Sequence, residues 1–184
     1  MPIVIKTITR KDVGEWLVNL LYSNDSDVID HHDFDQIIQH FISEVYLIHT
    51  SGIVKFARSF GNKHHFESQL IGSFVTAIES FMEITSKKLN NDNINLTDIG
   101  TSGSRWFMKK HSSVLLVAIV PNDSKFLKIP NGFELIGEIC SELMTNFAYL
   151  HQKNLDRDDF TVPEDFEQDV TLSIVEKIQS YDLY

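Results

Sequence analysis

The stretch SVLLVAIVP, residues 113–121, contains the longest apolar run of the chain and decides its fold class. Its apolar residues, Val114 to Val120, do not alternate with polar ones. A strand of this composition is covered on both faces or lies in the middle of a sheet. Pro121 closes the run, since proline has no N–H to donate to a neighbouring strand. We therefore expect a buried, central strand here.

Two β-rich runs lie upstream, at residues 45–50 and 53–60, and only Ser51-Gly52 separates them. Glycine supplies the positive φ that a tight turn needs, so this pair predicts a β-hairpin. Its second strand is expected to place Val54, Phe56 and Phe60 on one face. Two further strands are expected at residues 94–99 and 105–110, joined by the glycine-rich turn 100–103.

Before, between and after these strands, apolar residues recur at the spacing of an α-helix. We expect two short N-terminal helices, one near Val13 and one over residues 33–44. A long helix is expected at about residues 65–86, another over 133–151 and a last one from about Pro163. The long helix is expected to carry one apolar stripe: Phe66, Leu70, Ile71, Phe74, Ile78 and Phe81.

This element order predicts an α/β (α+β) fold with a five-stranded antiparallel sheet of spatial order 2-1-5-4-3. In that order the strands at 45–50 and 113–120 are neighbours, and those at 53–60 and 94–99 are the edges. Lys55 and Arg58 are charges that would protect the first edge from pairing with other chains. The residues expected to be deeply buried are Phe74, Ile78, Leu116, Ala118, Ile139 and Leu143.

Composition narrows the class of protein. The chain has 184 residues, 16 Lys+Arg and 26 Asp+Glu, which give a net charge of −10. So acidic a chain is a poor candidate for binding nucleic acid. It has one cysteine, Cys140, so no intrachain disulfide can form, and no uncharged apolar stretch approaches the roughly 18 residues of a membrane span. We expect a soluble, cytoplasmic protein without an integral membrane segment, any membrane contact being made through its partners.

No residue pattern indicates catalysis. His31, His32 and His40 lack the spacing of a metal-ligand set, and the turn at Gly100–Ser104 precedes a strand, whereas phosphate binding uses a helix N-terminus. Cys140 falls on the apolar stripe of its helix and is expected to be an inert core thiol. We expect no catalytic residues, no cofactor and no metal, and therefore no enzyme.

The segment from Val45 to His151 resembles the longin/roadblock superfamily. The resemblance rests on the opening hairpin Tyr46-Leu47-Ile48-His49-Thr50-Ser51-Gly52-Ile53, the motif Arg58-Ser59-Phe60, the helix start at residues 69–78, the central strand 114–120 and the covering helix 133–151. It implies a profilin-like fold. It also implies three parts: an N-terminal helical extension (1–44), a longin/roadblock-like core (45–151) and a C-terminal loop and helix (152–184). The helix near Val13 matches neither branch of the superfamily.

The resemblance implies a function in protein–protein contact. Such domains are mostly adaptors or regulators of small Ras-like GTPases, or subunits of vesicle-trafficking complexes, and they commonly form homo- or heterodimers. The expected partner is thus a small GTPase or another longin/roadblock-type subunit. Two alternatives stay open, a small-molecule sensor and a purely structural dimerisation module. Four residues are predicted to border the partner interface, Leu96 and Ile99 on the less protected edge strand and Trp106 and Met108 on the strand next to it.

Overall fold

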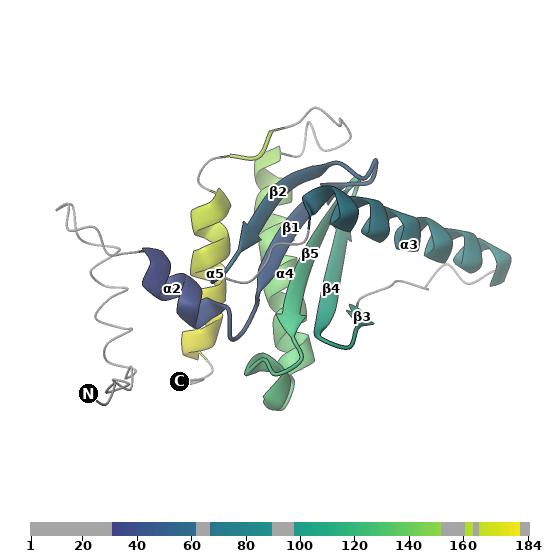
Figure 1. The fold of residues 1–184 in the computed structure, drawn as a ribbon. Coiled ribbons are helices and arrows are strands. Elements are labelled where there is room, and N and C mark those ends of the chain that lie inside the picture. The colour runs from purple at the N-terminus through teal and green to yellow at the C-terminus, as the bar shows by residue number, and fades with distance from the viewer. Residues whose placement is uncertain (1–30, 62–66, 90–97, 152–160, 164–165, 181–184) are drawn as a thin grey trace, which may run out of the picture.

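The computed structural model describes residues 31–61, 67–89, 98–151, 161–163 and 166–180 (Figure 1). Five strands form a single antiparallel sheet in the order β2-β1-β5-β4-β3. Their bounds are Glu44–His49 (β1), Val54–Ser59 (β2), Asp98–Gly100 (β3), Ser104–His111 (β4) and Val114–Pro121 (β5). The predicted sheet order is confirmed, and so is the pairing of β1 with β5, in which Leu47 lies opposite Leu116. Of the strand expected at 94–99, residues 94–97 lie outside the described residues.

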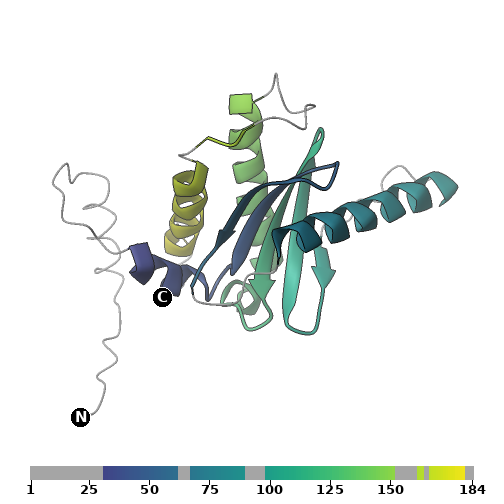
Figure 2. The ribbon, with the colours of Figure 1, turned by 45° about the horizontal axis from the view of Figure 1, so that its top comes forward.

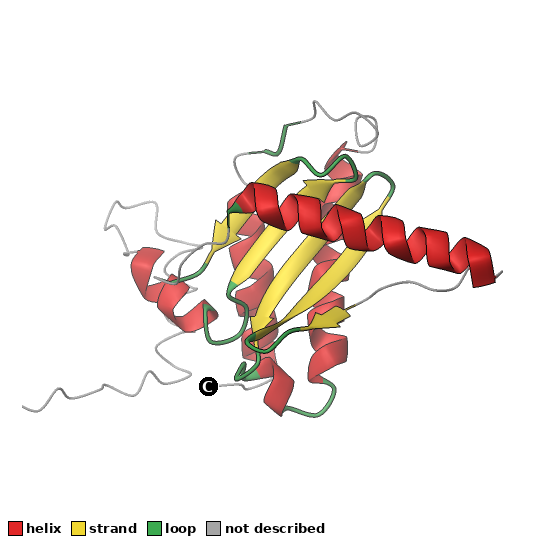
Figure 3. Ribbon diagram, turned by 45° about the vertical axis from the view of Figure 1, so that its right-hand side comes forward, coloured by secondary structure: helices red, strands yellow, loops and turns green. Residues whose placement is uncertain are grey.

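Helices form a layer on each side of this sheet. Their bounds are His31–Ile38 (α2), Ser68–Leu89 (α3), Gly132–His151 (α4) and Phe166–Ser180 (α5), with a short 3₁₀ helix η1 at Phe126–Lys128. Helix α3 crosses one face, and α4 and α5 lie against the other (Figures 2 and 3). The helix expected near Val13 lies outside the described residues.

Helix α2 is shorter than the expected helix over 33–44. It ends at Ile38, whose carbonyl accepts a hydrogen bond from the Phe41 N–H across a turn. The Ser43 N–H already donates to the carbonyl of Ile119 in β5, at 2.8 Å. Pairing with the sheet therefore competes with continuation of the helix, and the chain enters β1 at Glu44.

The central strand β5 sends side chains into both layers, as the unbroken apolar run predicts. Leu116, Ala118 and Val120 belong to the larger core cluster, which α4 and α5 cover. The alternate residues Leu115, Val117 and Ile119 belong to a smaller cluster under α3. All eight residues of β5 are buried, so the expectation of a strand covered on both faces is confirmed.

A β-bulge in the edge strand β2 changes which layer its side chains enter. Leu47 pairs with Phe56 but Ile48 pairs with Val54, so Lys55 has no counterpart on β1. Val54 consequently packs under α3, while Phe56 packs on the opposite side of the sheet. The expectation that Val54 and Phe56 share a face is wrong, because the extra residue shifts the alternation by one.

Four of the six predicted core positions are confirmed: Leu116, Ala118, Ile139 and Leu143 are all buried. The prediction is wrong for Phe74, which is exposed, and for Ile78, which is half-buried. Helix α3 forms the whole described layer on its side of the sheet, and only a narrow stripe of it, including Ile71 and Val75, is fully buried. The broad apolar stripe of the sequence thus contains two adjacent faces, of which the sheet covers one.

Candidate protein interface

A row of large apolar side chains runs along the uncovered face of α3. The exposed fractions are 64% for Leu70, 45% for Phe74, 65% for Phe81 and 55% for Ile84. These residues, here called the α3 row, are spaced by 4, 7 and 3 positions and therefore share one side of the helix. Spacing by threes and fours is typical of helices that pack along another helix.

Two glycines bring the first turns of α3 close to the sheet. A Cβ atom on Gly72 would lie 2.2 Å from the carbonyl oxygen of Gly52, at the β1–β2 turn. Gly52 itself has a φ of +88°, as the predicted hairpin turn requires. Helix α3 therefore packs closely against the sheet near its N-terminal end, and its C-terminal end projects beyond the sheet (Figure 3). The outer half of α3, with Phe81 and Ile84, has no described neighbour that buries it.

Phe74 connects the α3 row to the strands below. Its ring meets that of Trp106 on β4 edge to face, with centroids 5.3 Å apart. The Trp106 indole N–H donates to Ser104 Oγ at 3.0 Å, which fixes the orientation of the ring. An ion pair between Glu79 and Lys110 also joins α3 to β4. The row is thus supported from beneath by a packed layer.

The predicted partner residues lie next to this row but are less accessible than expected. Trp106 is 6% exposed and Met108 is 9% exposed, since both pack in the cluster under α3. Ile99 of β3 is partly buried against the same cluster, and Leu96 lies outside the described residues. A partner approaching this side would meet Phe74 before Trp106. That these four residues border the interface stays a prediction.

Two groups in these layers, the Tyr46 hydroxyl and the Cys140 thiol, have raised pKa values. Burial and the hydrogen bond that Tyr46 Oη donates to Glu44 raise the pKa of the Tyr46 hydroxyl above its usual value. Burial raises the pKa of the Cys140 thiol to about 12, which keeps it protonated and unreactive at neutral pH. The prediction that Cys140 lies in the core is therefore confirmed.

The described residues contain no group of three or more His, Cys, Asp or Glu side chains that could hold a metal ion. Among the helices that the structure describes, none is long and apolar enough to cross a membrane.

The α3 row could have been read from the sequence, because its members stand at helical spacing. The expected stripe combined three of them, Leu70, Phe74 and Phe81, with Ile71 and Ile78, which lie on the adjacent face of the helix, and it did not include Ile84. Sequence periodicity shows that a helix is apolar over a wide arc, but it does not show how much of that arc the sheet covers.

No protein-family model matches the chain, and no curated protein matches it in sequence. Among solved structures, Myxococcus xanthus MglB is similar, with 16% identity, a TM-score of 0.49, and coverage of 67% of this chain and 98% of that one. The gliding protein MglB of Thermus thermophilus has 14% identity and a TM-score of 0.46 over 59% of this chain and 80% of its own.

A Roadblock/LC7 domain from Streptomyces avermitilis is also similar, with 10% identity, a TM-score of 0.40, and coverage of 56% of this chain and 87% of that domain. These likenesses concern the fold. The sheet order β2-β1-β5-β4-β3, with α3 on one face and α4 on the other, is the sheet order that was expected from the sequence.

Proposed function

We propose that the protein is a non-enzymatic adaptor or regulator of small Ras-like GTPases, or a subunit of a vesicle-trafficking-type complex, and that it acts through protein contacts. The α3 row is the observation that carries this proposal. Large apolar side chains in water favour burial by about 25 cal/mol for each Å² covered. A contiguous row of them on a folded domain is typical of an interaction surface.

The sequence resemblance supplies the class of partner, and the α3 row supplies the surface. In this proposal the partner packs on Leu70, Phe74 and Phe81, with Ile99 and the other predicted edge residues bordering the contact. The ion pair of Glu79 with Lys110 places charged groups near the same surface. Charged rims around apolar centres are the usual composition of protein interfaces.

A purely structural dimerisation module is the second candidate, and the spacing of the α3 row favours it. Steps of 4, 7 and 3 residues along a 22-residue helix suit the pairing of α3 with the same helix of a second copy. Such a two-fold contact uses one patch twice and needs no other protein.

The test compares Phe81→Lys with Tyr149→Lys. Both replace an exposed aromatic residue by a cation, but Tyr149 lies on α4, on the other side of the sheet. Mass is measured by light scattering, and capture is measured with a panel of purified Ras-like GTPases loaded with GDP or a non-hydrolysable GTP analogue. We expect Phe81→Lys to abolish capture and Tyr149→Lys to preserve it.

The outcomes separate the candidates. Capture of a GTPase that Phe81→Lys removes supports the adaptor or regulator function. A doubled mass without capture of any GTPase in either nucleotide state supports the dimerisation module alone. A wild-type chain that stays monomeric and captures nothing contradicts both, and turnover by the isolated protein in a hydrolase or transferase assay contradicts the non-enzymatic assignment.

A further inference from the structure

The chain that precedes α2 has an amphipathic pattern of its own. Residues 9–21, here called the N-terminal segment, lie outside the described residues, and their pattern comes from the sequence. Five large apolar residues fall on one arc of the expected helix: Val13, Trp16, Leu17, Leu20 and Leu21. The opposite arc carries Lys11, Glu15 and Asn19. Such a helix is stabilised chiefly when its apolar arc packs against a folded surface.

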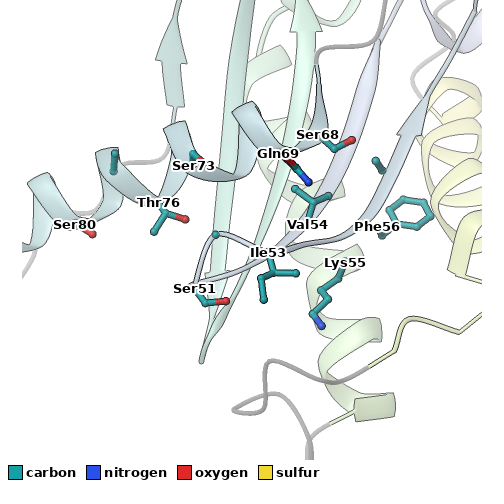
Figure 4. Close-up of a pocket in the computed structure, with 13 residues that line it drawn as sticks. Ser51, Ile53, Val54, Lys55, Phe56, Ser68, Gln69, Ser73, Thr76 and Ser80 are labelled. Carbon is teal, nitrogen blue, oxygen red and sulfur yellow. The ribbon is translucent and has the colours of Figure 1, made fainter.

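The α3 row is the surface of the described residues that best matches this arc. Seven large apolar side chains of the described residues are exposed, and the row contains four of them. The other three are separate: Ile53 lies beside the β1–β2 turn, and Phe133 and Tyr149 lie at opposite ends of α4. A groove of about 820 Å³ between β2 and the neighbouring flank of α3 is lined mostly by small and polar residues, such as Ser73 and Ser80 (Figure 4). It therefore offers less apolar surface than the row.

The starts of α2 and α3 flank the same half of β2. Arg58 of β2 donates two hydrogen bonds to Asp35, one turn from the start of α2. Phe56 of the same strand lines the groove together with Ser68, the first residue of α3 (Figure 4). Leu70, the first member of the α3 row, follows two positions later. The point at which the N-terminal chain joins the fold is therefore close to one end of the row.

The length of chain outside the described residues is sufficient for contact with the row. Residues 22–30 connect the N-terminal segment to α2, and these nine residues, when extended, span up to about 30 Å. As a helix the N-terminal segment is roughly 20 Å long, and the row from Leu70 to Phe81 covers about 16 Å of α3. Because the connection leaves from residue 21, Leu20 is expected near Leu70 and Val13 toward Phe81, so that the two helices run antiparallel.

We propose that the N-terminal segment docks on the α3 row of its own chain, and that a partner protein must displace it to bind there. The docking itself requires no partner, but its regulatory consequence rests on the proposed function, in which the row is the partner surface. An occupant on the same chain is favoured over a second copy, because a tether of nine residues gives it an effective concentration on the order of millimolar. The docked segment lowers the apparent affinity for partners, since only the undocked fraction is competent to bind.

The first experiment measures proximity by disulfide formation in the full chain. Leu20→Cys is combined with Leu70→Cys on the row and, as the control, with Ala57→Cys at an exposed position of β2. Ala57 adjoins Arg58, which holds α2, so a tethered segment that does not dock meets Ala57 at least as often as Leu70. The native Cys140 is buried and does not compete. After mild oxidation with diamide, free thiols are counted, and electrophoresis without reductant separates intrachain from interchain products.

We expect the intrachain disulfide of Leu20→Cys/Leu70→Cys to form at least tenfold faster than that of Leu20→Cys/Ala57→Cys. The pair Leu17→Cys/Leu70→Cys lies one helical turn away and allows for a register shifted by that amount. A ratio below tenfold for both pairs, or products that are mainly interchain, overturns the proposal.

The second experiment tests the regulatory consequence with the GTPase capture described above. Trp16→Lys should raise capture at least threefold over the wild type, whereas Asn19→Lys, which adds the same charge on the polar arc, should stay within twofold. Unchanged capture by Trp16→Lys overturns the competition between segment and partner. The two failures are distinguishable: if no variant captures a GTPase, the proposed function fails, while the disulfide with Leu70→Cys still decides whether the segment docks.

Discussion

The guanidinium group of Arg58 donates two hydrogen bonds to the Asp35 carboxylate, at 2.9 and 3.2 Å. Arg58 lies on β2 and Asp35 on α2, so this contact joins two elements through residues that are 23 positions apart in sequence. The same guanidinium pairs with Glu167 in the first turn of α5. One side chain of the edge strand therefore holds both the preceding and the final helix.

Replacing Arg58 by alanine should destabilise the protein by about 1–3 kcal/mol, because it removes charge-assisted hydrogen bonds and leaves the largely buried Asp35 carboxylate unpaired. Urea unfolding measures the change. Lys87→Ala is the control, since Lys87 forms a highly exposed pair with Glu83 of the kind worth roughly 0–0.5 kcal/mol. Equal midpoints for the two variants would show that Arg58 does not hold the helices.

Truncating Leu116 tests the central strand. Leu116→Ala should cost about 2–5 kcal/mol, because Leu116 is fully buried and the sheet cannot close over the cavity. Leu70→Ala deletes the same atoms from the exposed α3 row and should change the free energy of unfolding by less than about 0.5 kcal/mol. A loss below about 1 kcal/mol for Leu116→Ala in chemical denaturation contradicts the assignment of β5 to the core.

The close approach of Gly72 to Gly52 predicts intolerance of a single methyl group. Gly72→Ala should destabilise by about 1–3 kcal/mol, since the new Cβ would meet the backbone of the hairpin turn and push α3 off the sheet. Gly137→Ala on α4 is the matched control. Its Cβ would have no atom within 4 Å, so helix propensity alone should stabilise the protein by up to about 1 kcal/mol. Thermal unfolding of both variants gives the comparison.

The Cys140 thiol should be unreactive in the folded protein. Its pKa of about 12 lies well above that of a free thiol, so both its burial and its protonation protect it at pH 8. Ellman's reagent should modify no thiol per native chain and one per chain in 6 M guanidinium chloride, since the sequence has one cysteine. Rapid reaction of the native protein would place Cys140 outside the core.

The raised pKa of Cys140 also makes the stability of the protein depend on pH. The folded-state pKa of Cys140 is raised, so the protonated thiol favours the folded state fully below the unfolded pKa of roughly 8.5, and this contribution is lost as pH rises toward 12. The wild type should therefore lose more stability between pH 8 and 10 than Cys140→Ala does. Equal slopes for the two proteins would contradict the raised pKa.

Local patterns predicted the sheet well. The unbroken run at Val114–Val120 and the glycine between β1 and β2 are short-range signals, and they indicated the central strand and the hairpin that the structure has. The order of the strands then follows from the sequence of elements. The bulge at Lys55 was not predictable in this way, because no residue type is specific for it and its effect depends on how β1 and β2 pair.

The accessibility of the predicted interface residues differs from the expectation. Trp106 and Met108 are of residue types that are enriched at interfaces, but α3 covers them. The large apolar side chains that remain accessible on this side, the α3 row, belong to the helix itself. Periodicity places Leu70 and Ile71 on neighbouring parts of one apolar arc. Which of these two residues touches the sheet depends on how α3 packs against the hairpin turn at Gly72 and Gly52. These glycines are twenty residues apart, and local sequence patterns do not reveal such a contact.

The bulge in β2 also bears on how the protein unfolds. An edge strand is usually the first to fray, and it can detach without disturbing more than one core. Because Val54 enters the cluster under α3 and Phe56 contacts Phe166 of α5, detachment of β2 opens both layers at once. Amide hydrogen exchange at those β2 residues whose N–H bonds to β1 should therefore proceed with the global unfolding of the molecule and not as a local event, so that this border strand behaves as part of a single cooperative unit.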